Sequence, residues 1–120
     1  MGHIKMKRNG GDVSVQIRID GLIGWKFTFA TTDIDQPFSE KSSQTGENEF
    51  EFRLGSPESL FLDDNNWRFA LVNYSDEKQS YDLQIKWLQG GDTLENPWKN
   101  SGELDSNEVK EIPGDARLIF

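Results

Sequence analysis

The amino-acid sequence predicts an all-β protein, a single antiparallel β-sandwich of about seven or eight short strands with little or no helix. Apolar residues alternate with polar ones along most of the chain, turn-forming residues separate the alternating segments, and no window shows an apolar stripe at helical spacing. We expect the sandwich to be Ig-like or jelly-roll-like, and a closed barrel is the less favoured alternative.

The length of 120 residues predicts one domain, which spans residues 1–120. The scaling of surface with mass gives a folded area of roughly 6,600 Å², about a third of the area of the unfolded chain. One apolar core can therefore form without disulfides or metal. The chain contains no cysteine, which excludes disulfide bonds, thiol chemistry and cysteine-ligated zinc.

Alternation identifies the strands in chain order. In the first, Val13, Val15, Ile17 and Ile19 share one face and polar residues share the other, as in a half-buried strand. The same pattern returns at residues 23–29, 50–54 and 81–87, and two shorter strands are expected near 108–112 and 116–120. The strand at 67–74 also has apolar residues on its second face, which predicts a central strand that is covered on both sides for part of its length. Turn-forming residues lie between them at 9–11, 20–21, 75–78 and 113–115.

The connection between the first two strands contains Asp-Gly at residues 20–21, which resembles a two-residue hairpin turn. A two-residue loop would place Val15 opposite Lys26 and mix apolar with polar positions. A longer loop that pairs Ile19 with Ile23 keeps all the apolar residues on one face. The remaining alternative is that these strands lie in opposite sheets and do not pair.

The same counting applies to the strands that contain Trp67 and Trp87. A loop over residues 75–79 pairs Tyr74 with Ser80 and brings the two tryptophans side by side. We expect both tryptophans to face the core, since an aromatic cross-strand pair stabilises a sheet by about 0.5–1 kcal/mol.

Two shorter features have alternative interpretations. Residues 56–62 suit either a helix of one or two turns, with Ser56 as its N-cap and proline at its start, or a short strand. Asn73-Tyr74-Ser75 matches the N-glycosylation sequon, which matters only in a eukaryotic secretory route. The favoured interpretation is that Asn73 and Ser75 begin a turn.

Two long polar connections, 31–46 and 89–107, are the expected seat of function, because long structureless loops in compact domains are usually functional or disordered. Each carries an aromatic residue beside proline. The aromatic in the second connection either plugs the end of the sandwich or offers a flat apolar face to a ligand. The candidate ligand-binding residues are Trp98, Phe38, Asp92, Glu95 and Asn96.

The sequence predicts neither a metal site nor a catalytic centre, and no cofactor. Carboxylates in both connections suit calcium, but their spacing does not match the twelve-residue calcium loop. The single histidine, His3, lies near the start of the chain, where it gives a Ser-His-Asp arrangement no base. Acidic residues on the predicted strands face solvent, so they lack the burial that raises a carboxyl pKa.

The charge excludes whole classes of partner. Twenty-one acidic residues against thirteen basic ones give a net charge of −8, so we expect no nucleic acid and no membrane as partner. No segment approaches the roughly 20 apolar residues of a membrane span. The cellular compartment stays undetermined.

These observations predict a non-enzymatic binding module whose loop aromatics contact a carbohydrate or protein ligand. One alternative is an acidic interaction or inhibitor-type protein that binds a basic partner through its charge. Another is a homo-oligomeric assembly subunit that pairs through an exposed C-terminal edge strand near residues 116–120.

Overall fold

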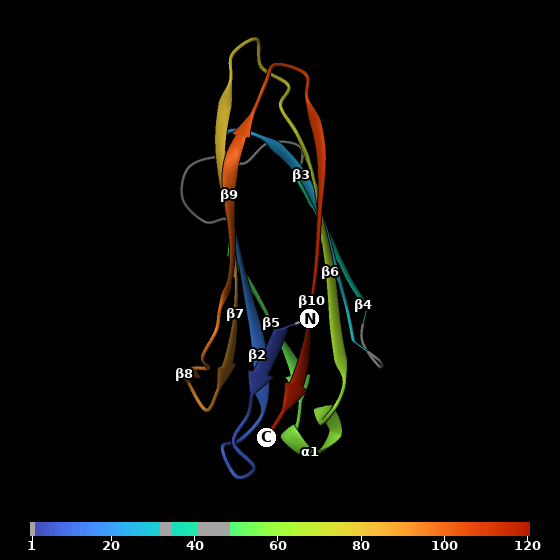
Figure 1. The fold of residues 1–120 in the computed structure, drawn as a ribbon, viewed down its shortest axis with the longest axis vertical. Helices are drawn as coiled ribbons and strands as arrows, with labels where there is room; N and C mark the ends of the chain where they lie inside the picture. The colour runs from blue at the N-terminus through green and yellow to red at the C-terminus, as the bar shows by residue number, and fades with distance from the viewer. Residues whose placement is uncertain (1, 32–34, 41–48) are drawn as a thin grey trace.

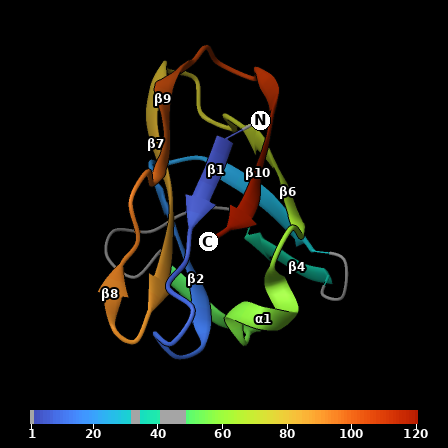
Figure 2. The same ribbon diagram turned by 60° about the horizontal axis from the view of Figure 1, so that its bottom comes forward.

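The computed structural model describes residues 2–31, 35–40 and 49–120, with the backbone alone for 35–40. The described chain is mostly β and forms two sheets, drawn in Figures 1 and 2. One sheet, the β6 sheet, has the order β1 (Gly2–Lys5), β10 (Val109–Ile119), β6 (Asp64–Val72), β3 (Gly24–Ala30) and β4 (Asp35–Glu40). The other, the β7 sheet, contains β5 (Glu49–Gly55), β2 (Val13–Asp20) and β7 (Gln79–Gln89), with β8 (Asp92–Thr93) and β9 (Trp98–Leu104) both paired to β7.

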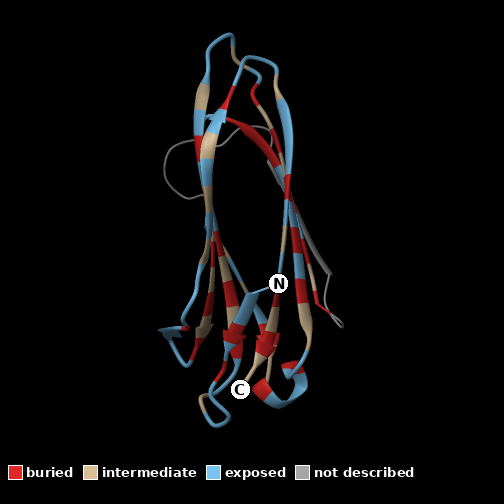
Figure 3. Cartoon of the chain, in the orientation of Figure 1, coloured by how far each residue is buried: buried red, intermediate tan, exposed pale blue. Residues whose placement is uncertain are grey.

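The two sheets lie face to face in a sandwich-like arrangement (Figure 1), and Figure 3 marks the buried residues along their strands. The buried apolar side chains of both sheets form one cluster. The alternation read from the sequence sets which residues enter it: Val13, Val15, Ile17 and Ile19 of β2 are fully buried while the residues between them are not. The described molecule measures 50 × 25 × 21 Å and has an accessible surface of 6954 Å².

The predicted pairing of Ile19 with Ile23 is wrong. Strand β2 pairs with β5 and β7, whereas β3 pairs with β4 and β6 in the opposite sheet. The chain therefore crosses between sheets at Gly21, whose φ is +136°. Any Cβ there would lie 2.6 Å from the carbonyl oxygen of Ser80, so glycine is required at this crossing.

The predicted pairing of the Trp67 and Trp87 strands is also wrong, although the two rings do meet. Strand β6 lies in one sheet and β7 in the other, and the ring centroids are 5.5 Å apart across the core. The same alternate residues of a strand face the core whether two strands pair within one sheet or face each other across the core. Alternation alone cannot distinguish these arrangements.

The expected loops and strand ends also require correction. The connection 89–107 contains β8 and β9, and 31–46 contains β4, while 32–34 and 41–46 lie outside the described residues. The expected turn at 113–115 lies within β10, which runs unbroken for 11 residues. Strand β1 pairs with β10 in parallel, so the β6 sheet is mixed and not wholly antiparallel.

Of the two interpretations of residues 56–62, a short helix or a short strand, the structure shows the helix, α1 (Pro57–Leu60). The hydroxyl of Ser56 accepts a hydrogen bond from the backbone N–H of Ser59 at 3.4 Å, and proline occupies the first turn. Both features favour a helix start, because the first N–H groups of a helix have no partner within it.

Candidate functional site

A cleft opens between the two sheets on the side where β9 and β10 face each other. Among the described strands, β9 pairs only with β7, and residues 109–115 of β10 pair only with β6. The sheets are therefore not joined by a strand on this side. The cleft, here called the tryptophan cleft, has a volume of about 230 Å³. Its lining residues are Gly2, His3, Ile4, Trp67, Trp87, Asn96, Pro97, Trp98, Asp115 and Ala116.

The walls of the tryptophan cleft are aromatic. The ring of Trp98 stacks on Phe69 with centroids 5.5 Å apart and planes 6° apart, and it meets Trp67 edge-on at 5.6 Å. Trp67 and Trp87 are only 4% and 1% exposed, whereas Trp98 is half-buried. Trp98 therefore packs on the core through one face, as the plug interpretation expected, and also contributes the most accessible aromatic surface of the cleft.

Polar groups surround this aromatic surface. The indole N–H of Trp87 donates to Oδ1 of Asn65 at 3.2 Å. The indole N–H of Trp67 is buried and has no hydrogen-bond partner among the described residues. A buried donor without a partner is costly, and this nitrogen is the atom of the ring that lies nearest to Gly114 of β10, where solvent does not reach it. His3 and Asp115 add exposed polar groups from β1 and β10.

Strand β9 and the segment before it place Asn96 and Trp98 together. After β8, the backbone N–H of Leu94 donates to the carbonyl of Trp87 at 2.8 Å, which ties the segment to β7. Asn96 then takes a φ of +64°, a left-handed conformation that asparagine tolerates better than most residues. The exposed amide of Asn96 and the ring of Trp98 thus line one cleft.

The other candidate residues do not join them. Asp92 in β8 and the exposed Glu95 do not line the tryptophan cleft. Phe38 lies in β4, with its Cα paired to that of Phe27. Because β4 and β10 are separated by β6 and β3 in the sheet order, Phe38 lies at the far edge from Trp98. Of the five candidates, the structure therefore brings two, Asn96 and Trp98, to the tryptophan cleft.

Sequence reasoning missed eight of the ten residues that line the cleft, among them the aromatic and ionisable side chains of Trp67, Trp87, His3 and Asp115. Alternation correctly gave both tryptophans an inward position, but an inward residue can lie in the middle of a core or at its open side. Whether these residues lie at the open side of the core depends on the edge position of β10 and on the pairing of β1 with it. Neither feature leaves a signal in the local sequence.

Residues 2–31 and 49–120 contain neither a metal-binding cluster nor a membrane-spanning helix. No group of three or more histidine or acidic side chains is placed to hold a metal ion. No helix in the described part of the chain is long and apolar enough to span a membrane.

Comparison with protein-family models, with curated proteins and with solved structures finds no match to this chain.

Proposed function

We propose that this chain is a non-enzymatic binding module that holds a carbohydrate in the tryptophan cleft. The observation that carries the proposal is that the exposed part of the Trp98 ring and the exposed amide of Asn96 line one cleft. A sugar ring has an apolar face that packs on an aromatic ring, and its hydroxyls both donate and accept hydrogen bonds. A single domain over residues 1–120, of Ig-like or jelly-roll-like type, belongs to the same proposal.

The side chains in the cleft favour binding over catalysis. His3 and Asp115 are the ionisable residues that line it, and its described lining includes no hydroxyl or thiol nucleophile. Glycoside hydrolysis ordinarily uses two carboxyl groups that flank the scissile bond, and Asp115 is one carboxyl group without a second in the lining.

The test is binding to an array of immobilised glycans, followed by titration of the tryptophan fluorescence with the best binder. We expect Trp98→Ala to weaken binding about tenfold, which corresponds to a loss of roughly 1.4 kcal/mol. Because Trp98 also packs on the core, Asn96→Gly is the second variant, as glycine accepts the positive φ and removes only the amide.

The matched control is Tyr74→Ala, which removes an aromatic residue that is 68% exposed and does not line the cleft. Its glycan affinity should equal that of the wild type. Absence of glycan binding by the wild type, or equal losses in Asn96→Gly and Tyr74→Ala, would contradict the proposal.

A second candidate function is the docking of a basic protein, and a groove of about 500 Å³ favours it. Asp20, Asp82 and Glu103 line this groove on β2, β7 and β9. Arg18 and Lys78 partly neutralise it, at 2.8 Å from Asp20 and 3.8 Å from Glu103. A partner bound through this charge would be lost between low and high ionic strength, whereas glycan binding in the tryptophan cleft would persist.

The homo-oligomer alternative was based on an exposed edge strand near residues 116–120. Residues 116–119 of β10 pair with β1 on one side, and 116–117 pair with β6 on the other. The segment expected to be a free C-terminal edge is therefore covered, because the start of the chain returns beside it. The uncovered edge of β10 lies earlier, at residues 109–115.

A further inference from the structure

We infer that the ligand site continues from the tryptophan cleft across β10 onto the outer face of the β6 sheet, and that its ligand is a neutral oligosaccharide longer than one ring. This inference rests on the proposed function, since it extends the same site.

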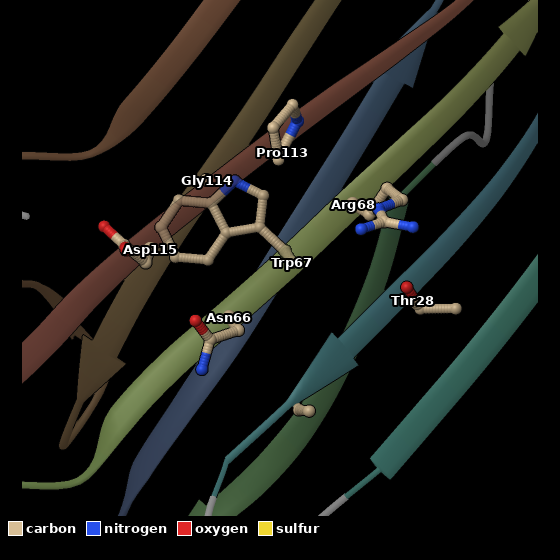
Figure 4. A pocket seen from close by; sticks show the side chains of 8 residues that line it. Thr28, Asn66, Trp67, Arg68, Pro113, Gly114 and Asp115 are labelled. Atoms are coloured by element: carbon tan, nitrogen blue, oxygen red, sulfur yellow. The ribbon is translucent and has the colours of Figure 1, made fainter.

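A second hollow, here called the outer groove, lies on the face of the β6 sheet that points away from the core (Figure 4). Its volume is about 560 Å³, more than twice that of the tryptophan cleft. It spans β3, β6 and β10 and is lined by Thr28, Ala30, Asn66, Trp67, Arg68, Pro113, Gly114 and Asp115.

The outer groove and the tryptophan cleft adjoin each other at β10. Trp67 and Asp115 line both of them. Figure 4 shows the indole of Trp67 reaching toward β10 at Gly114, where the ring occupies the space that a side chain would take and borders both hollows. Strand β1 begins to pair only at Ala116, so no described strand lies along the edge of β10 at the crossing point.

The polar side chains of the outer groove are available to a ligand. Thr28, Asn66, Arg68 and Asp115 are exposed, and none makes a side-chain hydrogen bond or ion pair with another described residue. They lie close together because Thr28 is the register partner of Arg68 and Asn66 is that of Asp115.

Arg68 makes no ion pair and no ring contact with a described residue, whereas the guanidinium of Arg8 packs over the ring of Phe120 at 4.4 Å from its centroid. Arg18, Arg53 and Arg117 each form an ion pair with an aspartate, at 2.8, 2.6 and 2.7 Å. In a chain with a net charge of −8, an arginine that lacks a carboxylate partner among the described residues keeps all its hydrogen-bond donors for a ligand.

The two volumes suggest how a ligand divides between the hollows. The 230 Å³ of the tryptophan cleft is below the roughly 300–1,000 Å³ of pockets that enclose a drug-sized ligand, so it suits one sugar ring. The outer groove then receives the ring or rings that follow.

The charges favour a neutral ligand. The outer groove offers the donors of Arg68 and the acceptors of Asp115 together, which matches hydroxyl groups, since these donate and accept. A polyanionic glycan would be repelled by the net charge of −8.

The experiment is calorimetric titration with neutral glycans of one to four residues in the gluco, manno, galacto and xylo series. For the series that binds, we expect affinity to rise about tenfold or more from one residue to two or three. Arg68→Ala and Asn66→Ala should reduce the affinity for longer glycans toward that for the monosaccharide and leave monosaccharide binding unchanged. Trp98→Ala should weaken both.

The control is Lys86→Ala, which removes one positive charge from β7 in the opposite sheet and should change neither affinity. Equal affinities for one residue and for longer glycans, or wild-type affinity of Arg68→Ala for the longer glycans, would overturn the inference while the proposed function stands. Failure of the wild type to bind any glycan would overturn the proposed function and the inference with it.

Discussion

Trp67 and Gly114 are register partners on β6 and β10, and the indole of Trp67 occupies the space where any other residue at position 114 would place its side chain. A Cβ atom at Gly114 would lie 2.7 Å from Cζ2 of Trp67. The ring is rigid and packs on Trp87 and Trp98 behind it, so it has little room to move. This contact fixes the position of the indole that lines the tryptophan cleft. It also requires a residue without a side chain at this point of β10.

Gly114→Ala should therefore destabilise the protein by about 1–3 kcal/mol, the usual cost of forcing extra atoms into a packed site. Urea unfolding measures this loss. Gly2→Ala is the control, because a Cβ at Gly2 would meet no atom within 4 Å. Equal stability of the two variants would mean that Trp67 can move away from β10.

The side chain of Asn73 links several segments of the chain by hydrogen bonds. It is fully buried, and its Nδ2 donates to the carbonyl oxygens of Glu77 at 2.7 Å and Leu104 at 3.1 Å. Its Oδ1 accepts from the backbone N–H of Ser75 at 2.9 Å and from the Ser75 hydroxyl at 2.8 Å. The turn interpretation of the sequon is thereby confirmed.

Asn73→Ala should lower the free energy of unfolding by at least about 2 kcal/mol, because each buried group left without a partner costs about 1–3 kcal/mol. Thermal and urea unfolding measure the change. Asn9→Ala, which alters an exposed turn asparagine, should have little effect. A stable Asn73→Ala variant would show that water replaces these hydrogen bonds.

The Asp64–Arg117 pair makes stability depend on pH. Nε of Arg117 donates to Oδ1 of Asp64 at 2.7 Å, and this hydrogen bond, together with the positive charge of the guanidinium, lowers the pKa of Asp64 below its ordinary value of 3.8. Partial burial opposes the shift. Because the folded pKa lies below the unfolded one, the pair stabilises the fold above pH 3.8, and this contribution is lost as the pH falls through the folded pKa.

We expect wild type to be more stable than Asp64→Asn near neutral pH and the difference to vanish in acid, as melting temperatures between about pH 2 and 6 would show. The effect should be small, since both side chains are about 40% exposed. Asp92→Asn, an exposed aspartate in β8, should follow the wild type throughout. A difference that persists below the folded pKa would exclude the ion pair as its cause.

The uncovered edge of β10 carries two features that oppose strand addition. Pro113 lacks a backbone N–H. Lys110 pairs with Leu71, so it occupies an inward-facing register, and its Nζ lies 5.8 Å from the centre of the Tyr81 ring. Proline and inward-pointing charges are devices that prevent edge strands from pairing with other chains.

The double variant Lys110→Val/Pro113→Val should associate at concentrations where the wild type remains monomeric, as light scattering after size-exclusion chromatography would measure. Lys86→Val, which lies in β7 in the other sheet, is the control and should stay monomeric. Association of the wild type itself would revive the assembly alternative.

The sequence predicted the inward face of most strands correctly, because burial follows the alternation of side chains along each strand. Val13, Val15, Ile17 and Ile19 are buried as expected, and α1 begins at its predicted cap. For the same reason the sequence predicted Trp67 and Trp87 to be core residues in contact, and their rings do meet.

The partners of the strands could not be predicted in this way. Ile19 and Ile23 both face the core whether their strands form a hairpin or lie in two sheets. The crossing at Gly21 depends on the carbonyl of Ser80, which lies far along the chain. Trp98 was identified as a candidate because it stood outside the long alternating runs, yet it begins a strand of its own.

The sequence by itself determined the class of structure, the core residues of the long alternating strands and the net acidic charge, because these follow from local periodicity and composition. The core residues Ile4, Met6, Leu94 and Leu104 lie outside those strands and were not predicted. Only the tertiary structure decided that Asn96 and Trp98 meet Trp67, Trp87, His3 and Asp115 in one cleft. That meeting depends on which strands lie at the edges of the two sheets. Edge position is set by pairing between distant segments, such as β1 with β10, and leaves no periodic trace in either segment.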